Sequence, residues 1–130
     1  MQEILTALAA LRQYDGVRKP ALVGLGLGGV MTLLARSLAG PLGATAVDLG
    51  GCRTDSDAFW LGPAYHPFIR KLGDVRAAVA LASPSPLLIA RPDAQLAKWA
   101  RAVYRIRFKS TALRVVRRAA RPADMASWVR

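Results

Sequence analysis

Few side chains in this 130-residue sequence are suited to covalent or acid–base chemistry. The sequence contains one histidine, His66, and one cysteine, Cys52. A zinc site takes three or four such ligands, so we expect no bound metal, and a lone cysteine excludes an internal disulfide. His66 stands in the run Tyr65-His66-Pro67, which favours a loop position over a catalytic role. We expect Cys52 to be a small buried residue that follows a strand.

The most informative segment is the glycine-rich run Gly24-Leu25-Gly26-Leu27-Gly28-Gly29. Within it, Gly24, Gly26 and Gly29 fit the pattern G-x-G-x-x-G, in which the backbone approaches a pyrophosphate at the start of a helix. Asp48 follows at the end of the next predicted strand, where an acid can accept hydrogen bonds from a ribose. On this interpretation the four residues form a dinucleotide-binding site.

The same six residues also fit a nucleophile elbow, Gly-x-Ser-x-Gly, which is a sharp turn from a strand into a helix. Gly24 and Gly28 then occupy the two positions that we expect to be small because backbone packs on backbone. Gly26 stands where the serine would be, and it has no side chain with which to attack a carbonyl. The amides of Leu27 and Gly28 would form an oxyanion hole or a small ligand site.

Residues 82–93 favour the elbow. The segment Ala82-Ser83-Pro84-Ser85-Pro86-Leu87-Leu88-Ile89-Ala90 resembles the "APxPLLI" strand of dienelactone hydrolase and acetyl xylan esterase relatives in the α/β-hydrolase superfamily. The first helix and the last helix, which contains Trp128, also resemble theirs. This resemblance covers nearly the whole chain and implies the C-terminal half of such a hydrolase.

The resemblance also shows what is missing. A hydrolase of this class carries a nucleophile, an acid and a histidine in that chain order. Asp93 is in place for the acid, although it fits the N-terminus of a helix equally well, and Asp48 is an alternative acid. No histidine follows Asp93. The resemblance therefore implies an esterase-like pseudoenzyme or a fragment, with Gly26 and Asp93 as vestigial positions and no cofactor.

These residues need a scaffold, and the hydrophobic pattern predicts one in which helices and strands alternate. We expect one α/β domain over residues 1–130, with a mostly parallel sheet of about four strands and helices on both faces. Residues 52–73 form an irregular or cap-like excursion, with a short helix near residues 68–72. The predicted helices are 2–13, 30–38, 74–82 (with Asp74 as N-cap), 94–106 and 122–129, and the predicted strands are 21–25, 44–49, 87–90 and 112–116.

The first of these strands, from Ala21 to Leu25, would lie in the middle of a complete hydrolase sheet. Its flanking strands would come before residue 1, so we expect an unpaired edge, which invites association. Two partners fit this edge: the missing N-terminal half of a longer protein, or a second copy in a homodimer.

The chain is strongly basic, with a formal net charge of +11, and residues 91–130 hold 11 of its 19 Lys and Arg residues. This asymmetry supports a third hypothesis, a basic module that binds nucleic acid or anionic surfaces weakly and without specificity. An Arg-rich, Ala-rich compositional habit is the alternative. The longest uncharged run, residues 20–35, is too short for a membrane span, and with no visible signal peptide we expect a cytoplasmic protein. The basic module would use Arg101, Arg105, Arg107, Lys109, Arg114, Arg117, Arg118 and Arg121.

Overall fold

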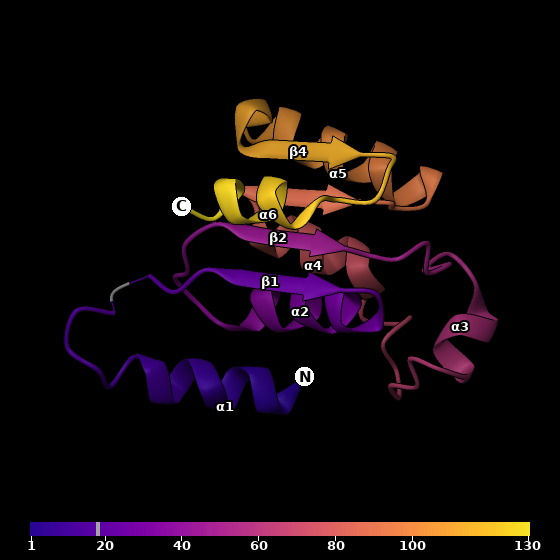
Figure 1. Ribbon diagram of the computed structural model, residues 1–130. Coiled ribbons are helices and arrows are strands. Elements are labelled where there is room, and N and C mark those ends of the chain that lie inside the picture. Colours follow the sequence, from indigo (N-terminus) through magenta and orange to yellow (C-terminus); the bar gives the residue numbers. More distant parts are fainter. Residues whose placement is uncertain (18) are drawn as a thin grey trace.

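The computed structural model describes residues 1–17 and 19–130, and helices alternate with strands along them (Figure 1). The elements are α1 (Gln2–Leu11), β1 (Leu22–Leu25), α2 (Leu27–Leu38), β2 (Thr45–Asp48), α3 (Asp57–Leu61), α4 (Asp74–Ala82), β3 (Leu87–Ala90), α5 (Ala94–Ile106), the short 3-10 helix η1 (Ser110–Ala112), β4 (Leu113–Val116) and α6 (Pro122–Trp128).

The strands of the described residues form one parallel sheet in the order β1-β2-β3-β4. The register pairs Leu25 with Asp48, Asp48 with Ala90, and Ala90 with Val116, so the carboxyl ends of the strands are level with one another. Every residue of β2 and β3 is buried, as expected for central strands covered on both faces. The parallel α/β sheet predicted from the sequence is confirmed.

Helices cover the two faces of the sheet unequally (Figure 1). Helices α2, α4 and α5 pack on one face and enclose the main core, in which Leu33, Val79 and Leu96 meet Val47 and Ile89 of the strands. On the other face, α6 packs through Met125 against the side chains of β2, β3 and β4. Helix α1 lies beside α2 and buries Leu8 against it.

Strand β1 is an edge of the sheet and is poorly covered. Its side chains alternate between the two faces, and Gly24 faces α2. Val23 and Leu25 therefore point to the face that carries α6, but α6 does not reach them, and they are 51% and 63% exposed. The edge predicted for the first strand thus exposes apolar side chains.

The expected excursion at residues 52–73 contains a helix, but not where the sequence analysis placed it. Helix α3 spans Asp57–Leu61, whereas residues 68–72 form turns. The indole of Trp60 is buried, and its Nε1 donates a 2.9 Å hydrogen bond to the carbonyl oxygen of Thr54. Arg70 pairs with both Asp57 (3.0 Å) and Asp74 (2.9 Å), which ties the segment to the start of α4.

One helix begins earlier than predicted, and another has the predicted limits but a different N-cap. Helix α2 begins at Leu27, three residues before the predicted start, because the chain enters the helix directly from Gly26. Asp74 is the first residue of α4 and Gly73 is its N-cap, but the Asp74 carboxylate still accepts a 3.0 Å hydrogen bond from the amide of Arg76. Within residues 1–17 and 19–130, no helix has the length and apolar character needed to cross a membrane.

Candidate functional site

The turn at Gly26 lies at the carboxyl end of β1 and joins it directly to α2. Leu25 is the last strand residue and Leu27 the first helical residue, so Gly26 alone reverses the chain. Its φ of 57° and ψ of −131° lie in a region that glycine adopts without steric cost. The amide of Gly26 donates a 2.7 Å hydrogen bond to the carbonyl oxygen of Asp48. A Cβ atom at Gly26 would meet no atom within 4 Å, so a side chain there would stand in open space.

Close packing around this turn depends on two other glycines. A Cβ atom at Gly24 would overlap the Thr32 side chain, and one at Gly29 would lie 2.6 Å from the Asp48 carbonyl oxygen. A Cβ atom at Gly28 would meet nothing within 4 Å. The prediction that Gly28 must be small was therefore wrong, because the backbone of α2 approaches β2 at Gly29 instead.

The amides of Leu27 and Gly28 belong to the first turn of α2. Such amides have no acceptor within their own helix and carry the positive end of its dipole. Leu27 and Gly28 are both exposed. The expected oxyanion-hole position therefore lies at an accessible helix N-terminus, immediately after Gly26.

Asp48 lies beside this turn, but its carboxylate is fully engaged. One oxygen accepts hydrogen bonds from Arg91 Nε (2.7 Å) and the Gly50 amide (2.9 Å), and the other accepts from the Ala120 amide (3.0 Å). Burial opposes ionisation, but the hydrogen bonds from Arg91, Gly50 and Ala120 outweigh it, so the pKa of Asp48 is lowered. Asp48 thus ties the ends of β2 and β3 to the connection before α6.

Asp93 is held as the N-cap of α5. Its Oδ1 accepts a 2.7 Å hydrogen bond from the Leu96 amide, and its Oδ2 accepts one of 2.6 Å from the hydroxyl of Thr54. A side chain that accepts from the third amide of a helix is a typical N-cap. Of the two roles considered for Asp93, the geometry supports the helix N-terminus directly.

In the part of the chain that the structure describes, neither His66 nor Cys52 lies in a group of side chains suited to catalysis. His66 Nδ1 lies 2.7 Å from the carbonyl oxygen of its neighbour Tyr65, on the wall of a cavity of about 420 Å³ in the segment 52–73. Cys52 is half-buried, and burial raises the pKa of its thiol. Among the described residues, no cluster of three or more His, Cys, Asp or Glu side chains could hold a metal ion.

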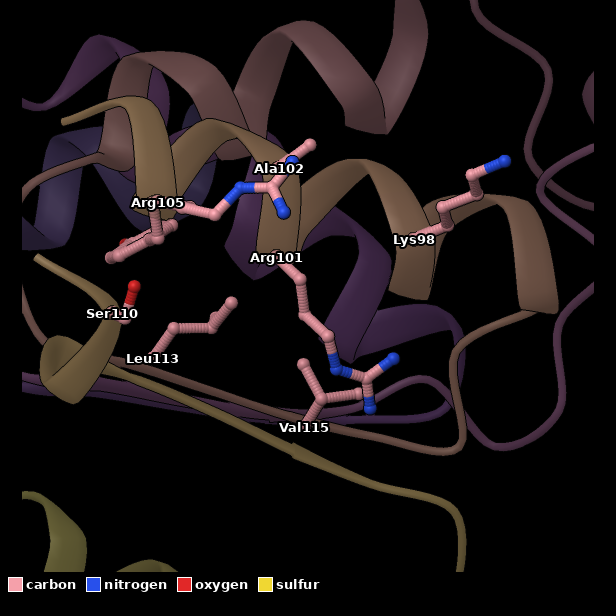
Figure 2. A pocket seen from close by; sticks show the side chains of 8 residues that line it. Lys98, Arg101, Ala102, Arg105, Ser110, Leu113 and Val115 are labelled. Atoms are coloured by element: carbon pink, nitrogen blue, oxygen red, sulfur yellow. The ribbon is translucent and has the colours of Figure 1, made fainter. Parts of the chain in front are cut away.

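A cavity that the sequence analysis did not predict lies between α5 and β4 (Figure 2). It has a volume of about 560 Å³ and is lined by cationic side chains of α5 and apolar side chains of β4. The sequence placed Arg101 and Arg105 on one face of a helix. It carried no signal that Leu113 and Val115 of a later strand would lie opposite them.

Comparisons with known proteins add no assignment to this geometry. No family model, curated protein or solved structure matches the chain.

Proposed function

We propose that this chain is an α/β-hydrolase-like domain that does not hydrolyse esters. The observation that carries the proposal is the turn at Gly26. A single residue with positive φ joins a parallel strand to a helix, and the side-chain position points into open space beside the exposed residues Leu27 and Gly28. This is the arrangement that a nucleophile elbow requires, with glycine at the nucleophile position.

The order of the other carboxyl-end residues supports the same proposal. In active relatives the acid follows a later strand than the nucleophile, and the histidine follows a later strand again. Here Asp93 follows β3 as the cap of α5. The connection between β4 and α6 has no histidine. Its Ala120 amide donates a hydrogen bond to the Asp48 carboxylate. Asp93 and the connection after β4, which would carry the acid and the histidine of a hydrolase, therefore have structural roles in this proposal.

Hydrolysis of an activated short-chain aryl ester tests this proposal. We expect the purified protein to release the alcohol no faster than an equal mass of an inert protein, because Gly26 supplies no nucleophile. Saturable turnover by the unmodified protein would contradict the proposal, and its survival in Cys52→Ala and His66→Ala would show that neither the only cysteine nor the only histidine supplies it.

We also propose that β1 pairs with β1 of a second copy of this chain. Its outer edge is unpaired within the described sheet, and Val23 and Leu25 are exposed. From β1 through α2 the only charged residue is Arg36, which is buried. The basic residues 91–130 include β4 at the opposite edge of the sheet. Two copies that meet at β1 would therefore keep their basic parts apart.

We do not propose dinucleotide binding. Gly26 and Asp48 do lie together, as a dinucleotide site requires. However, the Asp48 carboxylate is buried and already accepts three hydrogen bonds. A ribose would have to displace Arg91 or the amide of Gly50 or Ala120, and each displacement costs a hydrogen bond to the buried carboxylate.

A further inference from the structure

The cavity between α5 and β4 lies at the edge of the sheet opposite to β1, away from the turn at Gly26. Within the described residues β4 is the last strand of the sheet, and no further strand fills the space between β4 and α5. Figure 2 shows Leu113 and Val115 rising from β4 toward α5, and Arg101 extending from α5 toward Val115.

One wall of the cavity is cationic and the other is apolar, because residues at helical spacing on α5 and at strand spacing on β4 each share one face. Lys98, Arg101 and Arg105 are three and four residues apart, so they form one stripe along α5. Leu113 and Val115 are two residues apart in a strand, so they share the face of β4 that looks toward that stripe. The cavity therefore has a row of cations along one wall and an apolar floor.

The positive charge of this wall has no compensating partner among the residues that the structure describes. The residues that line the cavity include no acid. Of the ion pairs formed by residues 1–17 and 19–130, none involves Lys98, Arg101 or Arg105. A concave site with one sign of charge concentrates ligands of the opposite sign.

We propose that this cavity binds a single-chain organic anion, with a carboxylate or phosphate head on Arg101 and Arg105 and an apolar chain against Leu113 and Val115. Guanidinium groups bind both head groups through paired hydrogen bonds. The volume of about 560 Å³ suits a small ligand. The apolar floor distinguishes this ligand from a bare phosphate or a nucleic acid, neither of which gains from contact with Leu113 and Val115.

Calorimetric titration with four probes below their micelle-forming concentrations tests the proposal. Decanoate carries both the head and the chain, decyl phosphate exchanges the head group, decanol keeps the chain without charge, and inorganic phosphate is a head alone. We expect decanoate and decyl phosphate to bind with one site per chain. Decanol should bind at least about tenfold more weakly, and inorganic phosphate should give no saturable heat.

Matched variants assign the binding to this cavity. The double variant Arg101→Gln, Arg105→Gln removes two charges from the wall and should weaken decanoate binding about tenfold or more. Arg117→Gln, Arg118→Gln removes the same charge from exposed residues that do not line the cavity, and it should leave the affinity unchanged. Ala102→Leu keeps every charge but fills part of the cavity, and it should also weaken binding. Circular dichroism and thermal unfolding check that each variant folds.

Three results would overturn the proposal. One is the absence of saturable decanoate and decyl phosphate binding by the unmodified protein. The second is an equal loss of affinity in the Arg117 and Arg118 variant, which would indicate general attraction of anions to a basic chain. The third is binding of a short DNA duplex that displaces decanoate and depends on Arg101 and Arg105, which would assign the cavity to nucleic acid.

Discussion

Two adjacent glycines at the start of α2 differ in what a methyl group would meet, and this difference gives a matched pair of substitutions. Gly29→Ala would place a Cβ atom 2.6 Å from the Asp48 carbonyl oxygen and push α2 away from β2. We expect the free energy of unfolding to fall by about 1–3 kcal/mol. Gly28→Ala meets nothing within 4 Å and should be neutral or stabilising, by up to about 1 kcal/mol. Urea unfolding of both variants measures the difference, and equal losses would show that the close approach at Gly29 does not exist.

The buried Asp48 carboxylate gives the fold a dependence on pH. Its hydrogen bonds lower its pKa in the folded state, so the stabilisation is complete above the pKa of the unfolded chain, about 3.9. It is lost as the pH falls through the lower folded-state pKa. The free energy of unfolding should therefore decrease as the pH falls below about 4.

The variant Asp48→Asn isolates this contribution. Asparagine cannot ionise and does not attract Arg91 as a carboxylate does, so we expect the variant to be less stable at pH 7, by about 1.5–3 kcal/mol. Its free energy of unfolding should also fall less steeply than that of the unmodified protein between pH 5 and pH 3, as measured by urea unfolding across that range. Parallel curves for the two proteins would show that Asp48 does not supply the effect.

The structure gives contacts for the residues that the sequence singled out. Gly26 and Asp48 lie together, and Asp93 caps α5. The partners of Asp48 come from Arg91 and Ala120, which are distant in sequence, and no local pattern reveals such contacts. Likewise, only the placement of Thr54 beside α5 shows that both oxygens of Asp93 are engaged.

The unpaired edge of β1 leads to a prediction about the oligomeric state of the protein. If two copies pair through it, the protein should be a dimer by light scattering at micromolar concentrations, and Leu25→Lys should shift it toward monomer because a lysine on an edge strand opposes pairing. Leu81→Lys is the matched control, since Leu25 and Leu81 are both 63% exposed and Leu81 lies on α4. A monomeric unmodified protein, or equal effects of the two lysines, would rule out pairing through β1.

The elements themselves were predictable to different degrees. Helix α5 has the predicted limits, because Asp93 caps its start and its buried residues recur every four positions. The start of α2 was missed because Gly28 and Gly29 are poor helix formers, and tertiary packing against β2 overrides that preference. Helix α3 was missed because its five residues are too few for a periodic signal, and its position depends on burial of Trp60.

At the scale of the whole molecule, the two edges of the sheet have different surroundings. Exposed apolar side chains and a turn at a helix N-terminus occur at β1, and a row of cations lines the cavity beside β4. Composition alone predicted the basic C-terminal region but not its cavity, which depends on α5 and β4 coming together. At the first edge, we propose that the turn at Gly26 keeps the geometry of a nucleophile position without the nucleophile.

Because an absent activity does not identify its cause, the most direct measurement is the reactivity of a thiol introduced by Gly26→Cys in a Cys52→Ala background. Such a thiol would stand in open space at the N-terminus of α2, where helix amides stabilise the thiolate. Circular dichroism must first show that the variant folds, because positive φ is strained for cysteine. We predict a thiol pKa below its ordinary value of about 8.5, and alkylation by iodoacetamide at pH 7 about tenfold faster than that of Cys52 in the unmodified protein. A thiol in the folded variant with an unshifted or raised pKa, alkylated no faster than Cys52, would contradict the proposal that this turn keeps the geometry of a nucleophile position.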